Sequence, residues 1–320
     1  MIKITNLPEL NELHELNYNQ VIHVSLIGLE LTTIPEIIFK FINLEELDLS
    51  YNNLTIIPLQ INKLVNLKQL YLHINKITTI PSNISYLSKL TKLSLESNEL
   101  INIPATIGNL INLNELNLSF NKLTDIPSTI GNLVNLEKLF LSDNKIKIIP
   151  STIGKLHNLH ELFISDNQLT IIPKTIGNLS NLEYLYLYKN ELTTIPDTIG
   201  NLVKLKDLML SYNNLISIPT TISNLINIVE LELQYNKLKM IPECIKNINC
   251  KISIDESSYD NLDNLPIDCE YLQIYGLDRQ LNNLPFLLKE IRLYKPFIGG
   301  IDDIKVPYDC ALYIDDIKIK

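Results

Sequence analysis

A few side chains have types and spacing that could support metal-dependent chemistry. His157, His160 and Glu161 lie within one stretch of five residues. Zinc hydrolases place two histidines and a glutamate on one helix face, in the order HExxH or HxxEH. The order here is HxxHE, and the surrounding pattern predicts a turn followed by a strand, so the three side chains would not share a face. We interpret them as surface residues and predict no metal site.

A pair of carboxylates is the next candidate for chemistry. Asp143 and Asp166 recur 23 residues apart. General acid–base catalysis needs an acid and a base that are matched in position and pKa, and the neighbouring residues supply no such match. The chain also lacks a P-loop, a dinucleotide-binding glycine pattern and a nucleophile-elbow motif. The sequence predicts no catalytic residue and no cofactor, so we expect a protein that is not an enzyme.

The cysteines indicate the redox environment. Cys244, Cys250, Cys269 and Cys310 lie in the last quarter of the chain, and they form no CxxC pair. The first twenty residues, MIKITNLPELNELHELNYNQ, have no apolar stretch typical of a secretory signal. Free thiols in a reducing cytosol are then the default. We expect a cytoplasmic protein, with Cys250 and Cys310 buried because each precedes a predicted strand pair by two residues.

Charge and hydropathy limit the kinds of partner. The 320 residues carry a formal net charge of −9. Binding to a phosphate backbone needs a basic face, which this balance argues against. No apolar run approaches the roughly 18 residues of a membrane-spanning helix. We expect neither a nucleic acid nor a membrane as a partner, and we expect a monomer.

These side chains are carried by a repeat of 23 residues. The unit reads LxxLxLxxNxLxxIPxxIxxLxx, and residues 136–158 show it as LEKLFLSDNKIKIIPSTIGKLHN. Ten units run from Val21 to about Cys250, with Leu29 in place of the asparagine in the first. Proline recurs in one phase of the unit from Pro35 to Pro242.

Each part of the unit predicts an element. LxLxx is a short strand whose leucines point inward and whose neighbours point outward. IPxxIxxLxxL favours a short 3₁₀ or α segment with proline at its start. A buried asparagine satisfies backbone groups left unpaired by the tight turn after the strand, so the asparagines form a ladder through the core. The ladder residues are Asn52, Asn75, Asn98, Asn121, Asn144, Asn167, Asn190, Asn213 and Asn236.

The repeat is similar to that of a known family. The pattern resembles leucine-rich repeat proteins, and its form IPxxIGNLxNLxxLxLSxN resembles the Shoc-2 and Ras-suppressor class. Because one unit cannot bury its own apolar face, such units stack around a continuous core. The resemblance covers residues 21–250 and implies an α/β solenoid, a horseshoe with a concave parallel β-sheet and short 3₁₀ or α segments on the convex side. It also implies an intracellular binding scaffold, often in signal transduction, without identifying a partner.

A solenoid needs a cover at each end of its core. Residues 1–20 are expected to form the N-terminal cap, with an amphipathic helix at about 7–17 behind Asn6 as its N-cap. Residues 251–320 are expected to form shorter, degenerate repeats and a C-terminal cap, and the stretch PFLLKEIRLY resembles the 20-residue repeats of bacterial effector proteins. A separate small domain in this region is the alternative. The predicted strand pairs there are Ile252 and Ile254, Leu272 and Ile274, Ile291 and Leu293, and Leu312 and Ile314.

Large apolar side chains are predicted to gather on the concave face. The middle outward-facing column carries them in four consecutive repeats, and the stretch YLYLY adds two flanking tyrosines. Cross-strand ring contacts alone would contribute roughly 0.2–1 kcal/mol per pair. An exposed apolar patch rich in tyrosine is also typical of a binding hot spot, and we favour that interpretation. The candidate partner-binding residues are Phe140, Phe163, Tyr184, Tyr186, Tyr188, Met209 and Tyr71.

The edge of this patch is predicted to be acidic. Its carboxylates are Glu161, Asp207, Glu230 and Glu232. A fitting protein partner would offer an apolar knob flanked by basic residues. We predict a non-catalytic protein-binding scaffold that uses its concave face. The resemblance implies a second hypothesis, a signalling adaptor or regulatory subunit acting on a small GTPase or a phosphatase. A reader of carbohydrate or lipid patterns is a third, but it would call for secretion and disulfide-bonded caps.

The thiols provide a first test. All four cysteines of the purified protein should be reduced, and adding reductant should leave its melting temperature unchanged. Intact-mass analysis without reductant checks the first point, and thermal melts with and without reductant check the second. A disulfide between Cys244 and Cys250 would contradict the expectation and favour a secreted protein.

Overall fold

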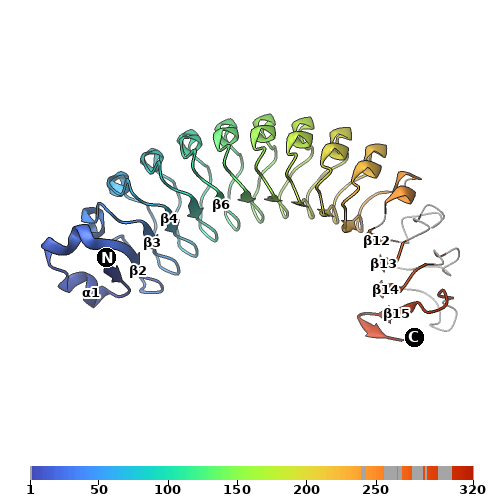
Figure 1. The fold of residues 1–320 in the computed structure, drawn as a ribbon, viewed down its shortest axis with the longest axis horizontal. Helices are drawn as coiled ribbons and strands as arrows, with labels where there is room; N and C mark the ends of the chain where they lie inside the picture. The colour runs from blue at the N-terminus through green and yellow to red at the C-terminus, as the bar shows by residue number, and fades with distance from the viewer. Residues whose placement is uncertain are drawn as a thin grey trace. The chain divides into compact units, whose positions relative to one another are not determined.

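The computed structural model describes residues 2–238, 243–248, 250–255, 265, 269–275, 284, 287–294 and 305–319. The chain forms two compact units, residues 1–163 and 164–320. In each unit the strands lie on one side of the coil and short helices lie on the other (Figure 1). The expected solenoid, with a parallel sheet on one side and short helical segments on the other, is confirmed within each unit.

The first unit contains eight strands among its described residues, and each is parallel to the next in chain order. The register advances by one repeat per strand, so that Leu116 pairs with Leu139. Both leucines are fully buried, as the strand alternation predicts. The strands are β1 Ile2–Ile4, β2 Val21–Ser25, β3 Glu46–Asp48, β4 Gln69–Tyr71, β5 Lys92–Ser94, β6 Glu115–Asn117, β7 Lys138–Phe140 and β8 Glu161–Phe163.

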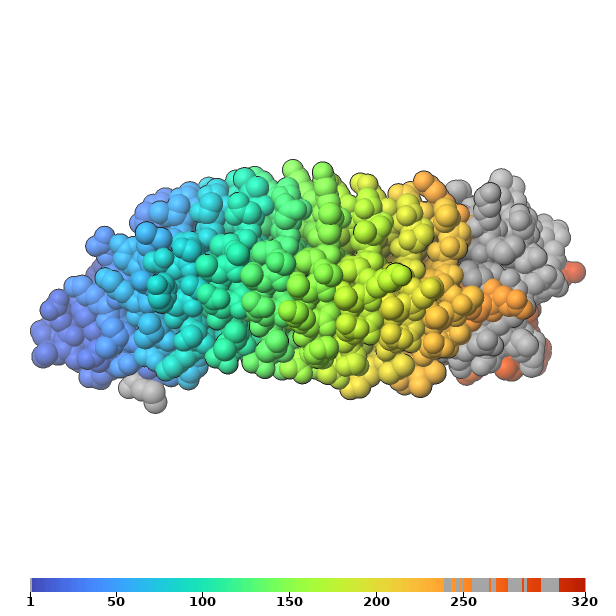
Figure 2. Space-filling view, turned by 90° about the horizontal axis from the view of Figure 1, so that it is seen from above, coloured from blue at the N-terminus to red at the C-terminus, as the bar shows by residue number. Residues whose placement is uncertain are grey.

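The repeat helices of this unit are 3₁₀ and not α. Pro127 begins η6 with φ −65°, and Leu133 ends it by donating its N–H to the carbonyl of Ile130, 3.1 Å away. The three-residue spacing of the apolar side chains matches this i to i+3 pattern. Figure 2 looks onto this side of the coil, where successive repeats lie as neighbouring bands. The helices are α1 Leu7–Glu12, η1 Glu15–Gln20, η2 Glu36–Lys40, η3 Leu59–Lys63, η4 Ser82–Tyr86, η5 Ala105–Asn109, η6 Ser128–Asn132 and η7 Ser151–Lys155.

The second unit begins with repeats of the same kind. Its 3₁₀ helices are η8 Lys174–Asn178, η9 Asp197–Asn201, η10 Thr220–Asn224 and η11 Glu243–Asn247. Its strands are β9 Tyr184–Tyr186, β10 Asp207–Met209, β11 Glu230–Glu232, β12 Lys251–Asp255, β13 Tyr271–Tyr275, β14 Glu290–Tyr294, β15 Ala311–Ile314 and β16 Ile317–Lys318.

The strand pairs expected after residue 250 all lie in strands β12 to β15. These strands continue the parallel ladder from β11, and only the last pair, β15 with β16, is antiparallel among the described residues. The register advances by fewer residues than in the repeats before: Leu231 pairs with Ile252, and Ile252 with Leu272. Pro242, the last proline of the repeat pattern, lies outside the described residues.

The N-terminal cap differs from the single helix expected at 7–17. A strand, β1, precedes α1, and the separate 3₁₀ helix η1 follows it. Asn6 is the N-cap as predicted, and its side chain accepts from the backbone N–H of Glu9 at 2.9 Å. Leu13 is extended, with φ −68° and ψ 120°, and this breaks the helical spacing. As a result Leu10 is buried, whereas Leu16 is 82% exposed.

The ladder asparagines bridge neighbouring coils. The Asn144 Nδ2 donates to the carbonyl of Leu118, 3.0 Å away in the preceding coil, and to that of Leu141, 3.0 Å away in its own coil. Its Oδ1 accepts from the backbone N–H of Leu123 at 2.9 Å. Asn144 is 9% exposed. One side chain therefore satisfies backbone groups of two coils, and it cannot be replaced by an apolar side chain without leaving them unpaired.

The residue before each ladder asparagine has a left-handed backbone. Its φ lies between 51° and 58°, although none of these residues is glycine. A left-handed L-residue costs roughly 1–2 kcal/mol, so the bonds of the asparagine must maintain the turn. This turn column consists of Tyr51, Ile74, Ser97, Phe120, Asp143, Asp166, Lys189, Tyr212 and Tyr235.

The glycines of the 3₁₀ helices allow close contact between coils. A Cβ on Gly131 would lie 2.3 Å from the backbone oxygen of Thr152 in the next coil. Thr152 also donates its hydroxyl to the carbonyl of Ser128, 2.6 Å away. Glycine is needed here for contact between coils, and not for the bend of the chain.

The ladder generates a stability prediction. Asn144→Ala leaves buried backbone groups without partners and should lower the free energy of unfolding by about 1–3 kcal/mol. Lys145→Ala, at the exposed neighbouring position, is the matched control and should change it by less than about 0.5 kcal/mol. Urea melts of the two variants check this, and equal midpoints would reject the role assigned to the asparagine.

Candidate functional site

The outward-facing side chains of β9 and β10 form an aromatic and acidic cluster in the second unit. Strand alternation buries Leu185 and Leu208 fully and turns Tyr184, Tyr186 and Met209 to the other face. Tyr186 and Met209 are a directly paired couple in the strand register, and all three outward residues are half-buried. The sheet therefore brings these three predicted residues together.

The tyrosine ring is bonded to a carboxylate in an electronegative setting. The Tyr186 hydroxyl donates a hydrogen bond to Asp207. Burial, followed by the nearby charge of Glu230, raises the pKa of Asp207, although the bond from Tyr186 opposes this effect. Burial and the charges of Asp207 and Glu230 also raise the pKa of Tyr186 to about 12. Both groups keep their ordinary charge at pH 7, so the cluster combines a neutral ring with a carboxylate that is costly to ionise.

The remaining acidic residues differ in their partners. Glu230 forms an ion pair with Lys251 at 2.6 Å. Glu232 accepts hydrogen bonds from the neutral side chains of Ser211, at 2.9 Å, and Gln234, at 3.3 Å. The negative charge of this cluster is therefore only partly balanced by a cation.

The first unit holds a second aromatic group. The rings of Phe140 and Phe163 lie 5.0 Å apart with an interplanar angle of 44°. Both rings are half-buried rather than freely exposed as predicted, because each covers the other. Glu161 forms an ion pair with Lys138 at 2.6 Å, so this part of the acidic edge is neutralised.

Tyr71 is separate from the other predicted aromatic residues. It lies on β4, and β5 and β6 separate it from Phe140 on β7. Its hydroxyl donates to Gln69 at 2.8 Å, and burial raises its pKa. Tyr188, the last residue of YLYLY, is half-buried just after β9.

Sequence reasoning missed a tyrosine row in the second unit, formed by Tyr212, Tyr235, Tyr275 and Tyr294. The first two rings stack at a centroid distance of 4.2 Å, and the last two stack at 4.6 Å. Tyr235 and Tyr275 lie 5.5 Å apart at 58° and connect the two pairs. Tyr212 is 47% and Tyr235 is 40% exposed. Their place immediately before a ladder asparagine was a signal in the sequence, but Tyr275 and Tyr294 belong to a different phase of the repeat.

The residues first considered for chemistry form no reactive site. His157 is exposed and His160 is half-buried, and Glu161 is bonded to Lys138. Within the described part of the chain, no group of three or more His, Cys, Asp or Glu side chains is placed to hold a metal ion. Asp166 forms an ion pair with Lys189 at 3.1 Å.

One cluster contains the residue types of a serine hydrolase triad in the wrong order. The Ser50 hydroxyl donates to Asp48 at 2.6 Å and lies 2.8 Å from the His73 Nδ1. In the hydrolase triad the histidine lies between serine and aspartate and takes the serine proton. Here the serine lies between the other two and is fully buried, so its oxygen is not available as a nucleophile.

Helices long and apolar enough to cross a membrane are also missing from the described ranges. All four cysteines are free thiols, and Cys250, Cys269 and Cys310 are buried. The burial of Cys250 and Cys310 agrees with their expected positions, and it raises the pKa of both.

Three regions of the chain match repeat families. Residues 42–85 match "Leucine Rich repeats (2 copies)", residues 105–194 match "Leucine-rich repeat region", and residues 180–238 match "Leucine rich repeat". A search of curated proteins finds no match.

Several solved structures are similar. A leucine-rich repeat protein of Leptospira interrogans is 32% identical, with 86% of this chain and 78% of that chain covered and a TM-score of 0.73. The plant peptide hormone receptor RGFR1 in complex with RGF2 is 25% identical, with coverage of 88% and 57% and a TM-score of 0.63. An internalin of Listeria monocytogenes, inlF, shares the fold at 22% identity, with coverage of 96% and 92% and a TM-score of 0.65.

The matches define the repeat type but no signalling class. The leucine-rich repeat fold generally mediates protein–protein interaction and is typically non-catalytic. With three matched repeat regions and a relative that is 32% identical over most of both lengths, the chain belongs to the leucine-rich repeat proteins.

Proposed function

We propose that this chain is a non-catalytic scaffold that binds a protein partner on the outward face of strands β9 to β11 and along the tyrosine row. The observation that carries the proposal is Asp207, whose carboxylate is partly buried beside Glu230. Burial of a carboxylate beside a like charge lowers stability. A sheet face with this arrangement gains when a cationic partner covers it.

The apolar part of the surface supports the same proposal. Tyr184, Tyr186 and Met209 supply a half-buried centre, and tyrosine is among the residue types enriched at interface hot spots. The tyrosine row extends the surface from β10 to β14. Four gaps between strands at about 4.8 Å each give the row a length of roughly 19 Å. Together the two parts approach the size of a small interface better than the centre alone.

The chemistry of the partner follows from this surface. An apolar or aromatic knob would pack on Tyr186 and Met209, and a lysine or arginine beside it would pair with Asp207 and Glu232. Plant receptor RGFR1, a structural relative, was solved with RGF2 bound, which makes a peptide or protein partner a reasonable class. We further propose a cytoplasmic location, because buried free thiols fit a reducing compartment, and a monomeric state.

Asp207 generates a prediction on stability. Its folded pKa is raised above the unfolded value of 3.8, so its ionised form contributes a destabilising term that appears as the pH rises through the folded pKa. Asp207→Asn should therefore raise the melting temperature at pH 7 by about 1–2 °C. The gain should disappear at pH 3, where the wild-type carboxyl is protonated.

Asp316→Asn is the control of opposite sign. Hydrogen bonds from Arg292 and Tyr294 lower the pKa of Asp316, so its ionised form stabilises the folded protein above that pKa. This variant should lower the melting temperature at pH 7, and the loss should shrink as the pH falls. Thermal melts at the two pH values check both variants, and an Asp207→Asn protein that is less stable at pH 7 would contradict the reasoning.

Binding generates the next prediction. Proteins captured from a cell extract by the wild type should be lost with Tyr186→Ala and with Asp207→Asn. For one captured partner, we expect Tyr186→Ala to weaken binding by at least about 2 kcal/mol, or about 30-fold. The same variant should lose less than about 1 kcal/mol of stability. Binding should also weaken as salt is raised, because part of the attraction is between charges.

Tyr86→Ala provides the matched control. This tyrosine is 62% exposed but lies on η4, on the 3₁₀ side of the first unit. Its loss should leave the capture unchanged. A partner that binds Tyr186→Ala and Asp207→Asn at full strength, but not Tyr86→Ala, would move the interface to the 3₁₀ side.

A further inference from the structure

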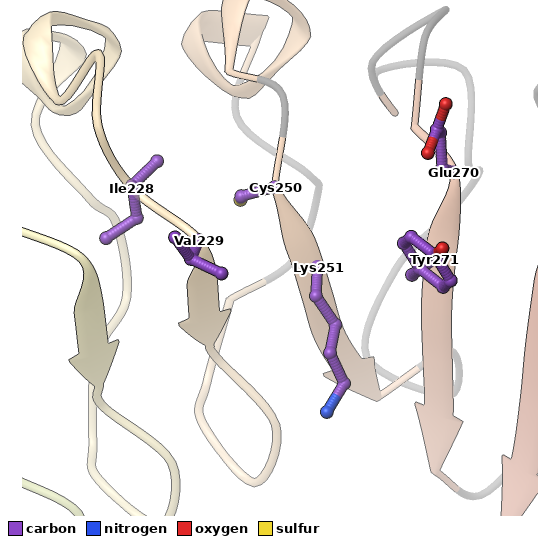
Figure 3. A pocket seen from close by; sticks show the side chains of 6 residues that line it. All are labelled: Ile228, Val229, Cys250, Lys251, Glu270 and Tyr271. Atoms are coloured by element: carbon purple, nitrogen blue, oxygen red, sulfur yellow. The ribbon is translucent and has the colours of Figure 1, made fainter.

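A hollow of about 430 Å³ lies where the repeat length changes in the second unit. It is lined by Ile228, Val229, Cys250, Lys251, Glu270 and Tyr271, at the starts of β11, β12 and β13. Figure 3 shows Val229 on one side, Glu270 and Tyr271 on the other, and Cys250 between them. This opening is at the start of the strands, whereas the tyrosine row follows their ends.

The hollow results from a gap in a row of charged side chains. The residue just before each strand often forms an ion pair with its neighbour one coil away. Glu183 pairs with Lys206 at 2.6 Å, and Glu270 pairs with Lys289 at 2.6 Å. Between these pairs the same position holds Val229 and then Cys250. Two short apolar side chains thus replace two long charged ones, and the space that the long side chains would cover stays open.

The lining is apolar and close to neutral. Val229 is 59% and Tyr271 is 43% exposed, while Ile228 and Cys250 are buried at 5% and 6%. The Lys251 ammonium forms an ion pair with Glu230 at 2.6 Å. Burial raises the pKa of the Cys250 thiol, so the sulfur is protonated and uncharged. A charged ligand would find no uncompensated opposite charge among these residues.

One polar group retains capacity for a ligand. Glu270 contacts Lys289 through one carboxylate oxygen, Oε1, and a carboxylate offers about four acceptor positions. The ring of Tyr271 and the sulfur of Cys250 favour an aromatic guest, because rings pack well against other rings and against sulfur. The volume lies within the roughly 300–1,000 Å³ of small-molecule pockets, and about 150 Å³ is enough for benzene.

We propose that this hollow binds a small neutral aromatic molecule with one hydrogen-bond donor, of the size of indole or phenol. The ring lies between Val229 and Tyr271 over the Cys250 sulfur, and the donor points to the Glu270 carboxylate. This site is separate from the proposed protein interface and does not depend on it.

Indole titrated into methyl-labelled protein, followed by NMR, tests the proposal. The methyl signals of Val229 and Ile228 should shift along a saturating curve, with a dissociation constant of about 1 mM or lower. The methyls of Val203, another exposed valine that is not part of the lining, should not move. Because it lacks the N–H donor, 1-methylindole should bind at least about threefold more weakly.

Two variants make the test specific. Val229→Lys places in the gap the residue type found at Lys206 in the same row, so the protein should fold normally and indole binding should fall at least tenfold. Tyr271→Ala, which removes one wall, should have a similar effect, with the Ile228 methyl as reporter. Val203→Lys, the same substitution outside the hollow, should leave binding unchanged. Thermal melts confirm that each variant is folded.

Two results would overturn the proposal. One is the absence of any shift at Val229 and Ile228 at the solubility limit of indole. The other is binding to folded Val229→Lys that stays within twofold of the wild type.

Discussion

The structure depends on one buried asparagine side chain in each repeat. Asn144 bonds to Leu118 in the preceding coil and to Leu141 in its own coil. Its bond to the N–H of Leu123 adds a third fixed point. These bonds hold the residue before it in a left-handed conformation that only glycine adopts at low cost. Because the same set of bonds recurs every 23 residues, successive coils stack in one register and the strands need only three residues to form a sheet.

That register decides what the outward face of the sheet presents. Each outward residue lies beside its equivalent in the next repeat, so the side chains form columns. A column of like charges would be unfavourable, and several are broken into ion pairs, such as Lys138 with Glu161 and Glu230 with Lys251. Asp207 is a local exception, since burial and Glu230 both raise its pKa. Conflict of this kind with stability is the physical basis for proposing that a partner binds there.

The C-terminal part of the second unit uses a different solution. Beyond Asn236 the ladder asparagine is not found in the described residues, and strands β12, β13 and β14 each extend to five residues. More of their backbone groups are paired between strands, which reduces the need for a bridging side chain. The shorter register also shifts the phase of the repeat. As a result Tyr235, from a turn, contacts Tyr275, from a strand, and the row of charged residues is interrupted at Val229 and Cys250.

The sequence by itself determined the features that follow from local spacing. The period predicted the parallel strands, the proline-led short helices, the positions of the ladder asparagines and the strand pairs after residue 250. Each of these depends on a few residues near one another in the chain, repeated many times. Tertiary structure decided how far each ring is exposed, as with Phe140 and Phe163, which cover each other. It also decided that the Tyr186 hydroxyl bonds to Asp207, that Leu16 is exposed, and that tyrosines from two phases form one row. These features depend on the exact distance and angle between side chains of neighbouring coils, and a pattern of residue types does not specify either quantity.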